Sequence, residues 1–227
     1  MRDIKAGEEL TTNYLHYQYH YYGHIYRQAE LCKYWYFTCE CDLCQASEEV
    51  VEDTQHWVEV LQNTNNRDIK QLTDTLHQLF TVFPKNHYFV LEVKRRIIEN
   101  IGDFRVNNIE EVEQRWLEKK VEFCRDHLVI QSMVSPGLSE YRAYISAHIA
   151  EPLYWLSKNR FLDNKDSQEV FDNNIKEVAE HLVTVVKIWG QYRVMSSENI
   201  KASNALDLLE MLDNMYLNQG ILDSLYC

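Results

Sequence analysis

The sequence predicts a mainly α-helical protein in which a small cysteine-rich segment with short strands precedes an antiparallel array of helices. Apolar residues recur every three or four positions through most of the chain, which is the spacing of one helix face. The 227 residues include only 6 glycines and 3 prolines, too few for a sandwich, a propeller or another turn-rich β fold. Four of the 6 cysteines fall in residues 32–44, which indicates a local metal site near the amino terminus.

The charge balance excludes several classes of protein. There are 23 lysines and arginines against 35 aspartates and glutamates, so the formal net charge is −12. A sequence-independent nucleic-acid binder needs excess cations to displace phosphate counterions, so direct binding of nucleic acid is not expected. No apolar run reaches the roughly 18 residues of a membrane span, and the first residues are charged where a signal peptide is apolar. We therefore expect a soluble protein of the cytoplasm or the nucleus, without a membrane partner.

The composition changes near residue 46, and we predict a domain boundary there. Residues 1–46 hold the cysteine cluster and 8 of the 15 tyrosines, whereas residues 47–227 look helical nearly throughout. The acidic stretch 45–53 lacks apolar periodicity and is expected to be a short linker.

Two short strands are expected at residues 2–6 and 8–12. They flank a turn at residues 5–7, where Gly7 permits a positive φ. Two such strands are not stable alone in water, so they need further structure to pack against.

Apolar spacing predicts six or seven helices after the boundary. Pro84 and Gly102 are expected to end the first two of them. Ser135 and Pro136 are expected to begin the fourth, as N-cap and first helical residue. The basic run 94–96 is interpreted as a solvated helix face. The predicted ranges are 69–83, 89–101, 109–128, 135–156, 171–189 and 200–217.

The strongest local signal is the C-x-C-x2-C spacing of Cys39, Cys41 and Cys44. Three thiolates this close can surround one side of a zinc ion, which takes four tetrahedral ligands in a structural site. The sequence therefore predicts a zinc site at these cysteines. Three residues are candidates for the fourth ligand: Cys32, His20 and His24.

The residues around this cluster resemble the end of a SET domain followed by its post-SET zinc motif. The matching elements are, in order, Gly7-Glu8-Glu9-Leu10-Thr11, then Tyr14, Arg27, Leu31 and the run 36–44. The most similar variety is the SET- and MYND-domain (SMYD) type of protein-lysine methyltransferase in its arthropod members. Those proteins continue into an all-helical C-terminal domain, which residues 134–142 also resemble. The resemblance implies that residues 1–46 end a SET domain and that residues 47–227 form a TPR-like helical domain.

The resemblance also implies a role for each matching residue. Tyr14 corresponds to the catalytic tyrosine, at the methyl-donor site, whose hydroxyl orients the lysine amine toward the methyl donor. Phe37 corresponds to the aromatic residue that packs on the adenine of S-adenosylmethionine. Cys39, Cys41 and Cys44 correspond to the three post-SET zinc ligands.

Two functions are therefore expected as alternatives. In the first, the chain is the C-terminal portion of an S-adenosylmethionine-dependent protein-lysine methyltransferase. It is then expected to be inactive alone, because no stretch of residues 1–227 matches the family's glycine motif and Asn-His pair that hold the donor. In the second, the chain is a non-catalytic, zinc-containing helical module that binds a partner peptide and needs no donor site. Either function implies a lysine-containing protein partner, such as a histone tail.

Overall fold

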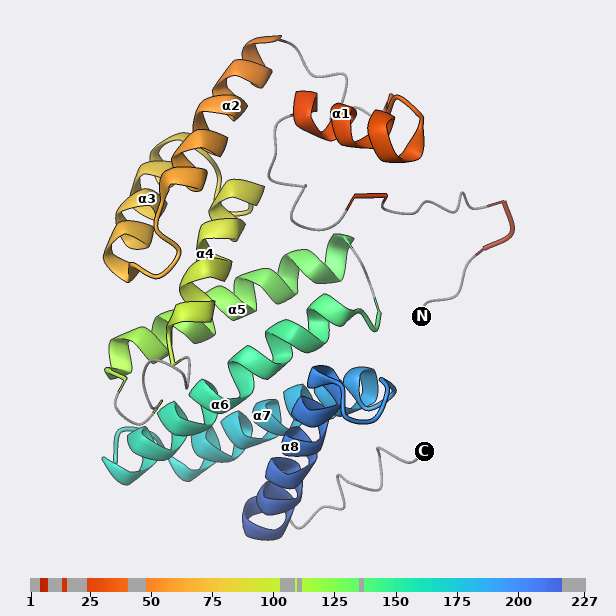
Figure 1. The fold of residues 1–227 in the computed structure, drawn as a ribbon. Helices are drawn as coiled ribbons and strands as arrows, with labels where there is room; N and C mark the ends of the chain where they lie inside the picture. The colour runs from red at the N-terminus through yellow and green to blue at the C-terminus, as the bar shows by residue number, and fades with distance from the viewer. Residues whose placement is uncertain are drawn as a thin grey trace. The chain divides into compact units, whose positions relative to one another are not determined.

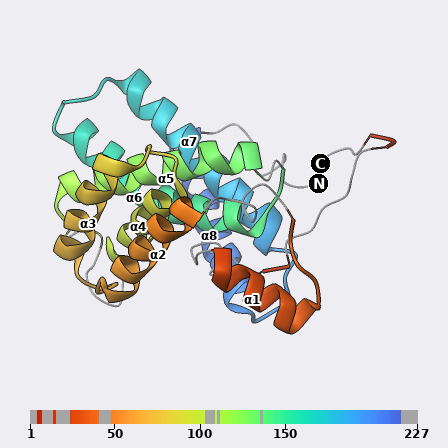
Figure 2. The same cartoon turned by 90° about the horizontal axis from the view of Figure 1, so that it is seen from above.

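The computed structural model describes residues 5–7, 14–15, 24–40, 48–102, 109, 112–134 and 137–217 (Figures 1 and 2). The regular structure of these ranges consists of eight α-helices and a π-helical turn, and none of these residues lies in a strand. The predicted mainly α-helical class is therefore confirmed, while the TPR-like arrangement stays a prediction. The elements are α1 (His24–Trp35), α2 (Glu48–Asn63), α3 (Ile69–Val82), α4 (Tyr88–Asn100), α5 (Gln114–Val134), α6 (Glu140–Leu162), α7 (Gln168–Trp189), α8 (Ser197–Leu212) and η3 (Asp213–Leu217).

The strands predicted at residues 2–6 and 8–12 lie almost entirely outside the described residues. The turn between them is described. Gly7 has a φ of +84°, in the left-handed region that glycine adopts without a steric penalty. The turn at residues 5–7 is therefore confirmed, and the strands stay a prediction.

The chain divides into two compact units between Ile97 and Ile98, a point that lies inside α4. The first unit contains α1, α2 and α3, and the second contains α5 to α8. The domain boundary that we predict at residue 46 stays a prediction.

The core of the first unit lies where the apolar faces of its helices meet. α2 and α3 lie side by side in both views (Figures 1 and 2). Asp68 caps α3, because its carboxylate accepts the N–H of Gln71 at 3.0 Å. The helix ends at Val82, just before Pro84, which confirms the predicted range to within one residue. The buried apolar residues of α2, α3 and α4 in this unit are Trp57, Val58, Leu61, Leu72, Leu76, Leu79, Phe89, Val90, Val93 and Ile97.

The linker expected at residues 45–53 is wrong from Glu48 onward, because α2 begins there. Its first residues are acidic, and carboxylates are favourable near the positive end of a helix dipole. Glutamate is also a good helix former. The absence of apolar periodicity in this stretch therefore does not indicate a linker.

The interpretation of residues 94–96 as a solvated face is also wrong. Lys94 is only 1% exposed, and its ammonium group lies 5.7 Å from the centre of the Phe80 ring. Arg95 and Arg96 both pair with Glu92, at 2.8 and 2.7 Å, and Glu92 is itself 2% exposed. This run of charge is therefore part of the interior of the unit, held by a buried carboxylate.

In the second unit, consecutive helices pack on one another in the order of the chain (Figure 1). α6 contacts both α5 and α7, and α7 contacts α8. Serine hydroxyls cap α7 and α8: Ser167 accepts from the N–H of Val170, and Ser196 from that of Asn199. The helices predicted at 171–189 and 200–217 are confirmed, each beginning three residues earlier, and the second ends in η3.

The fourth predicted helix begins at a different serine. The N-cap of α6 is Ser139, whose hydroxyl accepts the N–H of Arg142 at 3.2 Å. Residues 135–136 lie outside the described ranges, but Gly137 has a φ of +98° and so cannot belong to a right-handed helix. The cap predicted at Ser135 is therefore wrong.

Three other predicted bounds differ from the structure. α5 begins at Gln114 and not at Ile109, although Ile109 is buried, and it ends at Val134 and not at Leu128. α6 continues past the predicted end at Leu156 to Leu162, with Pro152 inside it. Proline removes one helical hydrogen bond, but Pro152 is buried within a face that packs on neighbouring helices. Among the described helices, none is long and apolar enough to cross a membrane.

Candidate functional site

The predicted catalytic and donor-binding residues lie in contact with each other in the first unit. The rings of Tyr14 and Phe37 meet edge to face, with their centres 5.1 Å apart. Trp35 contacts the same tyrosine ring in the same manner at 5.2 Å. Tyr14 remains 46% exposed, so two aromatic neighbours hold the ring while much of it stays accessible. The structure thus brings together the two residues that the resemblance assigns to methyl transfer.

A left-handed residue at the end of α1 turns the chain toward this cluster. Tyr36 follows the last residue of α1 and has a φ of +60°. Its N–H donates to the carbonyl of Cys32 at 3.2 Å, as in an αL helix cap. Glycine is the usual residue at this position, because a side chain there costs about 1 kcal/mol. This turn sets the direction in which residues 37–40 leave α1.

The segment that carries the first predicted zinc ligand is held along α1 by one side chain. The Gln28 Nε2 group donates to the carbonyl of Cys39 at 2.6 Å, and its Oε1 accepts the N–H of Cys39 at 2.9 Å. Both backbone groups of this cysteine are therefore fixed by a single amide. Sequence reasoning missed Gln28, because nothing in the mixed stretch around it marks a glutamine as a partner of a later residue.

The predicted zinc ligands fall partly within the described residues. Cys39 is half-buried and Cys32 is exposed on α1, both as free thiols. Cys41, Cys44 and His20 lie outside the described residues, and His24 is the first residue of α1. Within the described ranges no three histidine, cysteine or acidic residues come close enough together to hold a metal ion. The zinc prediction therefore rests on the cysteine spacing and on the fixed position of Cys39.

Cys124, in α5, is a structural residue of the second unit. It is buried, and burial raises the pKa of its thiol to about 12, although the nearby Lys120 ammonium acts in the opposite direction. A thiol with this pKa is almost fully protonated near neutral pH and is a poor nucleophile and metal ligand. Lys120 is itself buried and donates to the carbonyl of Ile101 at 2.6 Å.

No protein-family model matches the chain, and no curated protein matches it either.

Proposed function

We propose that this chain is the C-terminal portion of an S-adenosylmethionine-dependent protein-lysine N-methyltransferase of the SET- and MYND-domain type. The observation that carries the proposal is the contact between Tyr14 and Phe37. These residues are far apart in sequence. In the family, the residue that matches Tyr14 orients the lysine amine, and the residue that matches Phe37 packs on the methyl donor. A methyl transfer requires the amine and the donor to meet in line at about 3 Å, so the residues that hold them must be neighbours.

The residues present fit the positioning part of this reaction. Bound S-adenosylmethionine supplies an activated methyl group. The ring of Tyr14 packs against Phe37 and Trp35, and its hydroxyl would orient the lysine amine. Phe37 is only partly buried, which leaves ring surface for an adenine. Zinc at Cys39, Cys41 and Cys44 would hold the segment that follows this aromatic residue.

The test uses the chain together with the coding sequence that precedes Met1 in the same reading frame. Transfer of tritiated methyl groups to histone-tail peptides is expected, and Tyr14→Phe is expected to reduce it at least 100-fold. Tyr36→Phe is the matched control, because this substitution also removes one tyrosine hydroxyl and Tyr36 is 88% exposed. Full activity of the Tyr14→Phe variant would contradict the proposal.

Residues 1–227 alone are expected to bind no S-adenosylmethionine, since the donor-holding motifs of the family have no match in them. A calorimetric titration that shows micromolar affinity would contradict this expectation. The proposed place of action is the cytoplasm or the nucleus, and the proposed substrate is a lysine-containing protein. Immunofluorescence with an antibody against residues 47–227 tests the location.

A further inference from the structure

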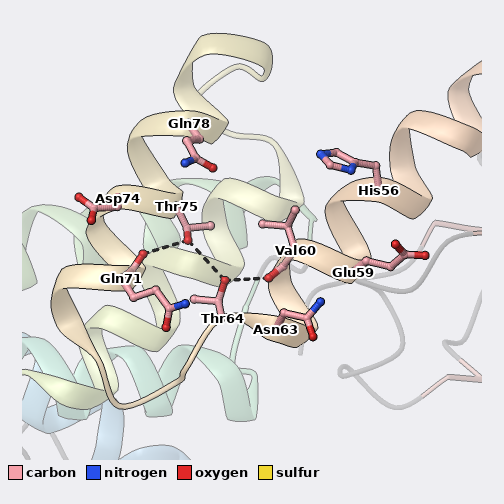
Figure 3. Close-up of a pocket in the computed structure, with 9 residues that line it drawn as sticks. All are labelled: His56, Glu59, Val60, Asn63, Thr64, Gln71, Asp74, Thr75 and Gln78. Atoms are coloured by element: carbon pink, nitrogen blue, oxygen red, sulfur yellow. Dashed lines mark hydrogen bonds between the residues drawn. The ribbon is translucent and has the colours of Figure 1, made fainter.

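A preformed polar groove lies between α2 and α3 in the first unit (Figure 3). Its volume is about 480 Å³, within the range of binding clefts in proteins, which is roughly 300–1,000 Å³. On each side the lining follows one helix face, at positions 56, 59, 60 and 63 on α2 and 71, 74, 75 and 78 on α3. The lining residues are His56, Glu59, Val60, Asn63, Thr64, Gln71, Asp74, Thr75 and Gln78.

Two buried threonines whose hydroxyls donate to backbone carbonyls form the floor of the groove. Thr64 and Thr75 are buried, and their hydroxyl oxygens lie 3.4 Å apart. The Thr64 hydroxyl donates to the carbonyl of Val60 at 2.7 Å, and the Thr75 hydroxyl donates to that of Gln71 at 2.9 Å (Figure 3). The hydroxyl donors of the buried threonines are therefore satisfied without a ligand.

The walls above this floor offer exposed groups that can bind a polypeptide. Asn63, Gln71 and Gln78 carry amides, which can both donate to and accept from a peptide backbone. Gln71 is held in place because its Oε1 accepts the N–H of Asn65 at 2.8 Å.

The charge of the walls selects the kind of polypeptide. Glu59 lies on the α2 side of the groove and Asp74 on the α3 side, and their carboxylates point outward, away from each other (Figure 3). None of the nine lining residues is lysine or arginine, so no cation in the lining offsets these carboxylates. A strand laid along the groove directs successive side chains to opposite sides, and two adjacent basic residues would then face the two carboxylates.

We propose that the α2–α3 groove binds an extended basic segment of a partner protein, with adjacent lysine or arginine side chains directed toward Glu59 and Asp74. The backbone of the segment pairs with the amides of the groove. This inference concerns binding alone and does not depend on methyl transfer. It goes beyond the proposed function because it assigns the partner a docking surface separate from Tyr14 and Phe37.

The probe is a fluorescein-labelled eight-residue peptide with two adjacent lysines between glycine and serine residues. Fluorescence anisotropy with residues 1–227 at low salt is expected to show saturable binding. Replacing both lysines with norleucine, which keeps the carbon chain and removes the charge, is expected to weaken binding at least tenfold. Raising the salt to 0.5 M is expected to weaken it as well, because salt screens exposed charges.

The decisive comparison uses two double variants with the same change in net charge. Glu59→Gln with Asp74→Asn is expected to raise the Kd at least tenfold. Glu122→Gln with Asp207→Asn is the matched control, because both residues are exposed and lie in the second unit. It is expected to change the Kd less than twofold. Circular dichroism confirms that both variants keep their helices.

Three outcomes would overturn the inference. One is the absence of binding by the wild-type chain, and another is an unchanged Kd in the groove variant. The third is an equal loss of affinity in both double variants, which would assign the binding to net charge and not to the groove. None of these outcomes depends on S-adenosylmethionine, so failure here is distinguishable from failure of the methyltransferase proposal.

Discussion

The side-chain amide of Gln28 hydrogen-bonds both backbone groups of Cys39, so one residue of α1 fixes the segment that carries the first predicted zinc ligand. The two bonds act on the N–H and the carbonyl of the same residue. They restrict the backbone before any metal binds, and restricting a ligand in its bound position favours binding. The zinc prediction can therefore be tested by a substitution at Gln28, without changing any of the cysteines.

We expect the purified, reduced chain to contain zinc and Gln28→Ala, which removes two hydrogen bonds, to weaken its retention about 30-fold. Each lost hydrogen bond contributes about 1 kcal/mol, and 1.4 kcal/mol corresponds to a tenfold change in affinity. Competition with a chromogenic chelator measures the Kd. Gln62→Ala is the control, because Gln62 is an exposed glutamine of α2. Absence of zinc in the wild-type chain would remove the metal prediction.

Tyr36→Gly is expected to stabilise the first unit by about 1 kcal/mol, because glycine adopts a φ of +60° without strain. The tyrosine side chain is largely exposed, so little burial is lost. Tyr34→Gly, inside α1, should instead destabilise the unit by about 1 kcal/mol. Urea unfolding gives both free energies, and a loss of stability in Tyr36→Gly would contradict the αL assignment.

Glu92→Gln is expected to destabilise the chain by about 2–3 kcal/mol, because it leaves Arg95 and Arg96 without their buried carboxylate. Burial alone would raise the pKa of Glu92, but the hydrogen bonds and charges of the two arginines lower it. Glu122→Gln, an exposed change of the same kind, should stay within 0.5 kcal/mol. Equal unfolding free energies for the two variants would show that the network contributes nothing.

Glu177 is expected to make stability depend on pH in the acid range. Its pKa is lowered to about 2, first by His181 and then by Arg125, which together outweigh the opposing effect of burial. Because the folded-state pKa of Glu177 is lowered, its contribution to stability is complete above the unfolded-state pKa of about 4.5. That contribution is lost as the pH falls toward 2.

Urea unfolding between pH 7 and pH 2.5 checks this expectation. Glu177→Gln should be less stable than wild type by about 1 kcal/mol at pH 7, since solvent screens this partly exposed pair. The difference should shrink below pH 4.5. Glu180→Gln, an exposed neighbour, should show no such convergence. A difference that stays constant down to pH 2.5 would contradict the lowered pKa.

Cys124 is expected to resist alkylation in the native chain, because its thiol is buried and its pKa is about 12. Iodoacetamide at pH 8 followed by mass spectrometry should label the exposed Cys32 after zinc is removed by a chelator. Cys124 should react only in denaturant. Rapid native labelling of Cys124 would show that the second unit opens readily.

Helices with strong apolar periodicity could be predicted from the sequence, and those defined by polar contacts could not. α3, α4 and α7 have an apolar residue at almost every third or fourth position, and their predicted ranges agree closely with the structure. The start of α2 is acidic and lacks apolar periodicity, so its sequence gives no such signal. The choice of Ser139 over Ser135 depends on the positive φ of Gly137, which glycine permits but does not require.

In the candidate site, too, some residues could be predicted from the sequence and others could not. Tyr14 and Phe37 could be identified by resemblance, and the structure places them in contact. Gln28 could not be identified, because its role comes from a tertiary pairing with a residue 11 positions away. The burial of Lys94 could not be predicted from the sequence either. A basic run is usually solvated, and only the surrounding fold removes Lys94 from water.

The nearest-neighbour packing of α5, α6, α7 and α8 has a consequence for how the second unit forms. Because each of these helices packs mainly on the one before or after it, most contacts join segments close in sequence. Such a topology has a low contact order and is expected to fold rapidly, growing helix by helix. Among the described elements, α5 and α8 at the two ends of this series each have one large helix–helix interface, so they should detach before α6 and α7 when the unit begins to unfold.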